Sequence, residues 1–172
     1  MAARRRRMRY KRLGEWFCGF EESVGSNWVN RATSQLRTIP AAQRDRFIEQ
    51  VRYLLQGRPE ILLALLHGSF LTGRTFRDVD LALYLEPNTI GSNALRDYEL
   101  EQGVRWSAEL GLPIDVRVLN DAPVTFRYHA LKGTALLVRD EEFVDELRAR
   151  TWDEYCDFAP FARRYLREVI GE

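Results

Sequence analysis

The segment of residues 65–83, LLHGSFLTGRTFRDVDLAL, constrains the fold of this chain more than any other. Its first and last parts are apolar enough to form buried strands, and a short polar connection separates them. That connection holds a Gly-Ser pair, a second glycine and two arginines, and it leads into Asp78 and Asp80. Two carboxylates so close together repel each other and are costly to bury. The segment therefore predicts two strands joined by a tight turn, with a positively charged ligand at the acids.

A third acid extends this pattern. Residues two apart in a strand point to the same face, so Asp78 and Asp80 are expected beside each other. Asp115 has a similar position in PIDVRVL, where apolar and polar residues alternate. If these strands pair, the three carboxylates raise one another's pKa unless a divalent cation binds. Mg²⁺ prefers carboxylates together with water and phosphate oxygens, so the three acids predict a metal site.

The turn after the first strand has the features of a phosphate site. Residues 69–73 are expected to begin a helical turn, whose free N–H groups bind anions. The first glycine lets a phosphate approach, the serine adds a hydroxyl donor, the second glycine allows a tight turn, and the arginines neutralise charge. The expected nucleotide-binding residues are Gly68, Ser69, Gly73, Arg74 and Arg77.

Hydrophobic periodicity and the positions of Pro and Gly predict the remaining elements. Helices are expected at 41–56, 92–110 and 123–131, strands at 60–67, 79–86, 113–119 and 134–138, and a helical stretch at 140–170 that breaks or kinks near Pro160. Tyr53 and Val104 are expected among the residues that face the core. This order predicts an α+β fold with a small mixed β-sheet of three to four strands, flanked by helices and followed by C-terminal helices.

Charge and cysteine content bear on domain organisation and location. Residues 1–12 hold seven of the 26 Arg and Lys residues and no acid, which leaves a net charge of −6 on residues 13–172. We expect residues 1–38 to form an extension, basic and disordered at 1–12, with RNA contact by that tail as a weak alternative. The folded domain is expected at 39–172. Two cysteines without metal-like spacing, and no apolar run that could span a bilayer, favour a cytoplasmic protein.

HGSFLTGRTFRDVDLAL resembles the signature of the DNA polymerase β-like nucleotidyltransferase superfamily, in which Gly-Ser, a spacer and Asp-x-Asp precede a third carboxylate. The resemblance to its minimal nucleotidyltransferase (MNT) family covers about residues 41–170, through PIDVRVLNDAP, FRYHALKG, LLVRDE and the final RRYLRE. The spacer from Gly73 to Asp78 is shorter than in many relatives. Arg77 stands where a serine often precedes the first aspartate, and its role stays open. The resemblance implies the nucleotidyltransferase fold for residues 39–172.

The resemblance also implies an activity. It is the transfer of AMP from ATP to a hydroxyl, with pyrophosphate leaving. Asp78 and Asp80 would hold two Mg²⁺ ions, and Asp115 would share one of them and help to deprotonate the acceptor. The Gly-Ser pair would hold the triphosphate. MNT proteins of this type resemble antitoxins that adenylylate a tyrosine of a HEPN-domain ribonuclease toxin, so such a toxin is the implied protein partner.

Each candidate residue also has a structural interpretation. Acids at a strand start can pair with nearby arginines, a serine can cap a helix, and a histidine or aromatic residue can simply pack. These interpretations concern Asp78 and Asp80 with Arg74 and Arg77, Asp115 with Arg117, Ser69, His67, and the aromatic stretch at 152–165. Two other functions stay open: an MNT-like antitoxin that acts by binding alone, and a nucleotidyltransferase for a small molecule such as an aminoglycoside.

Overall fold

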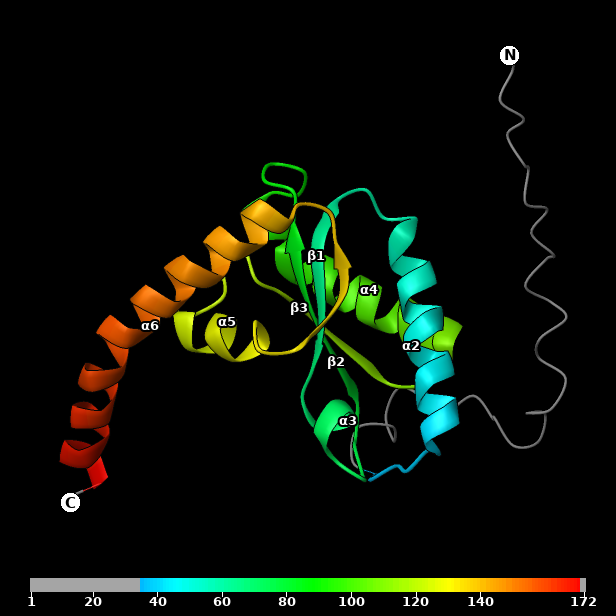
Figure 1. The fold of residues 1–172 in the computed structure, drawn as a ribbon, viewed down its shortest axis with the longest axis horizontal. Coiled ribbons are helices and arrows are strands. Elements are labelled where there is room, and N and C mark those ends of the chain that lie inside the picture. The colour runs from blue at the N-terminus through cyan, green and yellow to red at the C-terminus, as the bar shows by residue number, and fades with distance from the viewer. Residues whose placement is uncertain (1–34, 171–172) are drawn as a thin grey trace, which may run out of the picture. The chain divides into compact units, whose positions relative to one another are not determined.

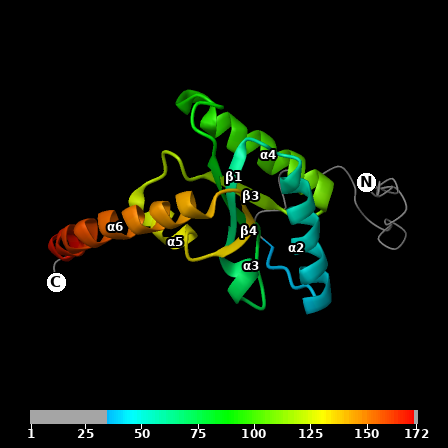
Figure 2. The ribbon, with the colours of Figure 1, turned by 45° about the horizontal axis from the view of Figure 1, so that its top comes forward.

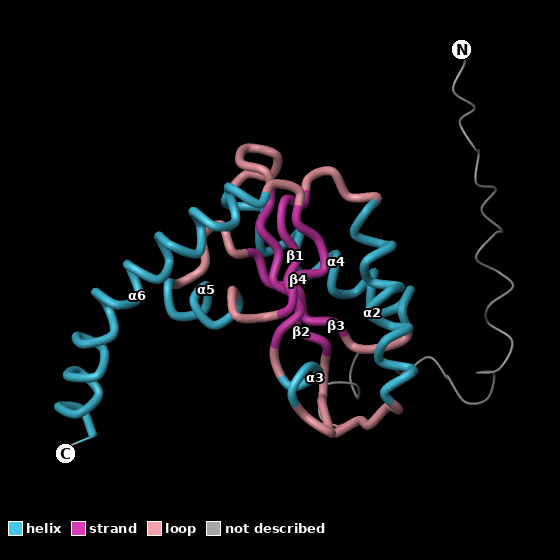
Figure 3. The backbone as a smooth tube through the Cα atoms, in the orientation of Figure 1, coloured by secondary structure: helices cyan, strands magenta, loops and turns pink. Residues whose placement is uncertain are grey.

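The computed structural model describes residues 35–170. The expected basic tail at 1–12, its RNA contact and most of the expected extension at 1–38 lie outside the described residues. Figures 1 and 3 show the elements. In chain order they are α2 (Ala41–Gln56), β1 (Ile61–His67), α3 (Ser69–Thr72), β2 (Val79–Leu85), η2 (Ser92–Ala94), α4 (Leu95–Leu110), β3 (Ile114–Val118), α5 (Val124–Ala130), β4 (Thr134–Val138) and α6 (Glu141–Ile170).

The four strands form one mixed sheet in the order β3-β2-β1-β4. β1 pairs antiparallel with β2 and with β4, whereas β2 and β3 are parallel. This confirms the α+β fold with a small mixed sheet. Within residues 35–170, no helix is long and apolar enough to cross a membrane.

Helices cover both faces of the sheet. α2 and α4 lie on one face, and α5 and the first part of α6 lie on the other (Figures 1 and 2). Both faces of the sheet carry apolar side chains, because successive side chains along a strand point to opposite faces. In β2, Val79, Leu81, Leu83 and Leu85 pack into the α2/α4 core, while Ala82 and Tyr84 pack into the α5/α6 core. The sheet is therefore the middle layer, with a separate hydrophobic core on each face.

Two expectations about the helices were wrong. Tyr53 is 52% exposed and Val104 is 64% exposed, so neither belongs to the core. Of the break or kink predicted near Pro160, the break is absent, because α6 is one helix that runs through this residue. Pro160 is exposed, so water can hydrogen-bond to the carbonyl that loses its N–H partner there.

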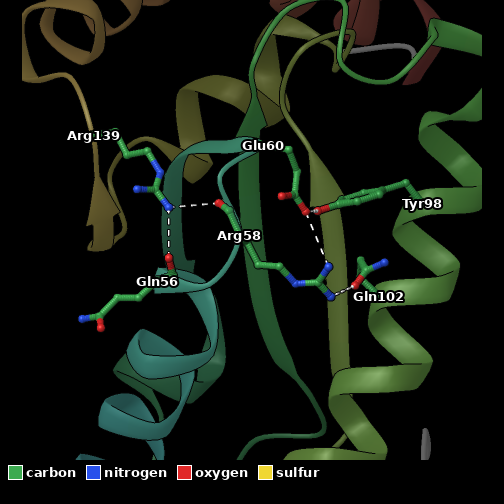
Figure 4. Close-up of polar contacts among 6 residues, drawn as sticks. All are labelled: Gln56, Arg58, Glu60, Tyr98, Gln102 and Arg139. Atoms are coloured by element: carbon green, nitrogen blue, oxygen red, sulfur yellow. Dashed lines mark hydrogen bonds and ion pairs between the residues drawn. The ribbon is translucent and has the colours of Figure 1, made fainter. Parts of the chain in front are cut away.

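A polar network closes the end of the sheet where β1 begins (Figure 4). Arg58 pairs with Glu60 and donates to Gln102, and the Tyr98 hydroxyl donates to Glu60. Burial, followed by the charge of Glu60, raises the pKa of Tyr98. Arg139 donates to three main-chain carbonyls at 56, 58 and 61. This network ties α2, β1, α4 and the end of β4 together and leaves the other end of β1 free for the Gly-Ser turn.

Candidate active site

The sheet register brings the predicted acids to one place. Asp80 on β2 is aligned with Asp115 on the parallel strand β3, and also with His67 on β1. Their strand neighbours Val79 and Ile114 are buried in the α2/α4 core. The two acids therefore point to the opposite face, where α5 lies. Asp78 immediately precedes β2, so the three acids gather at the end of the sheet next to the turn after β1. We call Asp78, Asp80 and Asp115 the carboxylate site.

The three acids influence one another electrostatically. Burial raises the pKa of Asp80 to about 6, and the negative charges of Asp78 and Asp115 contribute to that rise. Burial also raises the pKa of Asp115; Arg117 opposes this rise, and Asp78 and Glu99 add to it. Within the described part of the chain, neither Asp78 nor Asp80 has an ion pair with an arginine. The proposed pairing with the arginines of the turn is thus not observed, and the charge at Asp80 has no direct compensation.

Asp115, in contrast, has a cation beside it. Its Oδ2 lies 3.7 Å from Arg117 Nε, and Arg117 Nη1 lies 3.7 Å from Glu99 Oε2. Arg96 Nη1 lies 2.8 Å from the same Glu99 oxygen, while Glu99 Oε1 accepts a hydrogen bond from the Val118 N–H. In this structure Asp115 is therefore paired with Arg117, as its structural interpretation predicts.

The oxygen ligands of the carboxylate site suit a divalent cation, but the side chains are not arranged as they would be around a bound ion. Among residues 35–170, no three His, Cys, Asp or Glu side chains are arranged so that they could hold a metal ion. Asp80 and Asp115 do lie on one face, and the negative charge of Asp78 contributes to the raised pKa of both. Hard oxygen donors with uncompensated charge are the ligands that Mg²⁺ takes. The positions and the chemistry of the three acids therefore fit a cation. The feature that does not fit is the contact of the Asp115 side chain with Arg117.

The Gly-Ser turn lies directly against Asp80. Gly68 has a φ of +77°, a conformation that glycine adopts readily, and a Cβ there would lie 2.0 Å from Asp80 Oδ2. Gly68 occupies the N-cap position of α3, so the structural interpretation of Ser69 as a helix cap is not observed. Ser69 is exposed, and its hydroxyl has no hydrogen bond within the described residues. A ligand can therefore reach this hydroxyl beside Asp80.

Hydrogen bonds to the main chain of Gly73 hold the segment that follows this turn. The Gly73 N–H donates to the Ser69 carbonyl over 2.8 Å, and Arg44 Nη2 donates to the Gly73 carbonyl over 3.1 Å. A Cβ at Gly73 would lie 2.7 Å from the Thr75 carbonyl oxygen, so this close approach requires glycine. Arg74 and Arg77 are exposed between α3 and β2, and neither has an ion pair in the described part of the chain. Their charges are available to a ligand.

Two further features lie beside the carboxylate site, and the packing of His67 agrees with its structural interpretation. His67 packs edge-on against Phe126 with ring centroids 5.6 Å apart, and its buried Nε2 has no hydrogen bond within the described residues. Burial lowers the pKa of His67, with Asp115 opposing, which favours the neutral ring. A cavity of about 480 Å³ opens next to Arg117, and its lining includes Arg96, Glu99, Asp121 and Phe126. The spacing Arg96-x-x-Glu99 on a helix was the available sequence signal for that charged lining.

These observations define the class of protein: an α+β domain whose mixed sheet presents three acids beside a Gly-Ser turn. The model of the family described as polymerase beta, nucleotidyltransferase matches residues 49–142, more than half of the 172-residue chain. The chain belongs to this family. The matched range contains the carboxylate site and all five expected nucleotide-binding residues. No curated protein sequence is similar enough to this chain to count as a match.

Several solved structures contain a chain with this fold. One is a toxin–antitoxin with AMP-PNP, at 18% identity and a TM-score of 0.60, covering 72% of this chain and 98% of that chain. Another is a tri-AMPylated Shewanella oneidensis HEPN toxin in complex with MNT antitoxin, at 16% identity and a TM-score of 0.59, covering 74% and 98%. A third is the toxin–antitoxin MntA–HepT, at 16% identity and a TM-score of 0.58, covering 73% and 98%. At these identities the likeness shows a shared fold.

Proposed function

We propose that this protein is a Mg²⁺-dependent adenylyltransferase of the MNT type, which moves AMP from ATP to a hydroxyl, a tyrosine hydroxyl in our proposal, of a HEPN-type toxin and so acts as its antitoxin. The observation that carries this proposal is the alignment of Asp80 with Asp115 on one face, next to the Gly68 turn. A purely structural acid pair would not need an open turn with a free serine hydroxyl beside it.

In this proposal the chain's own groups have distinct tasks. Asp78, Asp80 and Asp115 hold the cations, and the Gly68–Ser69 turn holds the triphosphate, with Arg74 and Arg77 offsetting its charge. Asp115 accepts the proton as the acceptor oxygen bonds to the α-phosphorus, and the bond to pyrophosphate breaks. Two Mg²⁺ ions, when bound, stabilise the attacking and leaving oxygens.

Two features support a protein as the acceptor. Solved structures with this fold include an AMPylated HEPN toxin in complex with an MNT antitoxin, and another contains an ATP analogue, AMP-PNP. The outer part of α6 extends away from the sheet (Figure 1) and bears exposed apolar side chains. These are Phe158, Phe161, Tyr165 and Val169, which share one side of the helix. Such a patch on a projecting helix favours a protein partner, and we propose the HEPN-type toxin as the protein that covers it, in the cytoplasm where ATP is available.

Transfer of label from [α-³²P]ATP tests the proposal. The protein is incubated with Mg²⁺ and a purified HEPN-domain protein encoded beside it, and the partner is then separated and counted. We expect label on the partner, and none with Asp80→Asn. Absence of label with the wild-type protein, under conditions where the two proteins bind each other, would contradict the proposed activity.

The ion pair between Asp115 and Arg117 favours one alternative, an antitoxin that acts by binding alone. Under this alternative the carboxylate site is vestigial, because one of its three acids, Asp115, is already paired with Arg117. Under that alternative, Asp80→Asn still neutralises the toxin in cells. Under our proposal the variant binds the toxin but fails to protect, so toxicity and complex formation measured together separate the two functions.

A further inference from the structure

Arg117 lies between two acids with different roles. On one side it faces Asp115 of the carboxylate site, and on the other it faces Glu99 of α4, at 3.7 Å in each case. The Glu99 carboxylate is only 11% exposed and is fixed by the Val118 N–H and by Arg96. The Asp115 side chain is 52% exposed, and its carboxylate has no hydrogen bond within the described residues. Glu99 is thus the fixed partner of Arg117, and Asp115 is the partner that can move.

We propose that Arg117 is a positioning residue that holds Asp115 away from Asp78 and Asp80, so that the divalent cation must compete with Arg117 for the third carboxylate. This inference rests on the proposed function, because it assigns a control to the same site. The backbone already aligns Asp115 with Asp80. Only side-chain rotation is therefore needed for Asp115 to leave Arg117 and join the other two acids.

The surroundings allow Arg117 to release its partner. The cavity of about 480 Å³ beside it gives the guanidinium room to move away from the sheet, and Glu99 in the same lining keeps it paired. Once Asp115 leaves, the Arg117 charge stays near Glu99 and Arg96, away from the cation. A site of this kind has low affinity for the cation alone. It gains Asp115 as its third ligand only when the cation, bound together with the triphosphate, attracts this carboxylate more strongly than Arg117 does.

Binding of Mn²⁺ alone, followed by the electron paramagnetic resonance signal of the free ion, tests the inference without any activity. In Arg117→Gln, Asp115 is free and a nearby positive charge is gone. A divalent ion and a guanidinium about 8 Å apart in a water-like dielectric repel enough to change binding about fivefold. The freed Asp115 adds a ligand to this effect of charge, so we expect Mn²⁺ to bind more than about fivefold more tightly. Arg117→Lys keeps the charge and should bind Mn²⁺ nearly as weakly as the wild type.

Two further variants distinguish the effect of the contact between Arg117 and Asp115 from the effect of net charge on Mn²⁺ binding. Arg96→Gln removes a charge from the same cavity without touching Asp115. Among the described residues Arg96 pairs only with Glu99, and it lies farther from Asp115, so at about 12 Å its charge alone predicts a gain of no more than about threefold. Within the described residues, Glu99→Gln leaves Asp115 as the one ion-pair partner of Arg117, so Mn²⁺ should bind more weakly. That loss should largely disappear when Glu99→Gln is combined with Arg117→Gln. Thermal melts of each variant check that the fold is kept.

The outcomes distinguish the inference from the function beneath it. Unchanged or weaker Mn²⁺ binding in a folded Arg117→Gln, with binding in the wild type, overturns the role of Arg117 alone. An equal gain in Arg96→Gln also overturns it, because net charge then explains the effect. Absence of Mn²⁺ binding in the wild type and in Arg117→Gln, both with and without AMP-PNP, overturns the metal site and the proposed function together.

Discussion

Replacement of Asp80 by asparagine should stabilise the metal-free protein. Asp80 sits half-buried between like charges, and its pKa rises from 3.8 to about 6. That rise corresponds to about 3 kcal/mol of unfavourable free energy for the ionised form. Because the group is half open to water, screening reduces this to roughly 1 kcal/mol. Asparagine has nearly the same shape and carries no charge, so it removes this cost.

The direction of the pH dependence follows from the raised pKa. The folded state holds the Asp80 proton more tightly than the unfolded state, so the contribution to stability is complete below about pH 4. It is lost as the pH rises through about 6. Asp80→Asn should therefore match the wild type near pH 4. At pH 7.5 it should be more stable by roughly 1 kcal/mol, a rise in Tm of about 2–4 °C.

Urea and thermal unfolding in EDTA at both pH values measure this difference. Asp153→Asn removes the same charge from an exposed site without an ion pair in the described residues, and it should change stability by less than about 0.5 kcal/mol. With Mg²⁺ and AMP-PNP the order should reverse, because only the wild type gains stability from binding. If Asp80→Asn is no more stable than the wild type at pH 7.5 in EDTA, the electrostatic argument for the carboxylate site is wrong.

Three other substitutions test separate parts of the structure. Gly68→Ala places a Cβ against Asp80 at a positive φ, so it should cost about 1–3 kcal/mol in urea unfolding and abolish label transfer; normal transfer would contradict the close contact. Arg139→Lys cannot donate to all three carbonyls at the start of β1, so unfolding should become easier by about 1–3 kcal/mol at unchanged transfer. An unaltered melting temperature would show that these bonds contribute little. Phe161→Glu, at a side chain that is 72% exposed, should leave stability within about 0.5 kcal/mol but weaken toxin binding at least about tenfold by calorimetry. Unchanged affinity would place the partner elsewhere.

The sequence predicted the sheet because its strands carry strong local signals. The run TALLV became β4 at 134–138, and the alternation of PIDVRVL gave β3 with its acid on the side away from the α2/α4 core. The alignment of Asp80 with Asp115 followed from parallel pairing of two strands, which periodicity suggests but does not fix. Whether these acids hold Mg²⁺ and act in transfer stays a prediction.

Two errors came from the helical period, and other features depend on tertiary contacts. At 100° per residue, Tyr53 and Val104 each lie on the side of their helix opposite its buried residues, and both are exposed. The contact of Arg117 with Glu99 joins a strand to a helix, so only the fold reveals which of two nearby acids is the fixed partner. The continuity of α6 through Pro160 likewise depends on an exposed position, which the sequence did not specify.

The central claim is that three acids and the Gly-Ser turn form one site for a cation and a nucleotide. Mn²⁺ added below stoichiometry to ¹⁵N-labelled protein with AMP-PNP tests it directly, because the ion broadens the amide signals nearest to it. The account predicts that the amides of Gly68, Asp80 and Asp115 broaden first, and that Asp80→Asn abolishes the effect. Broadening centred elsewhere, or broadening near Asp80 that spares Asp115 and Gly68, would contradict the account.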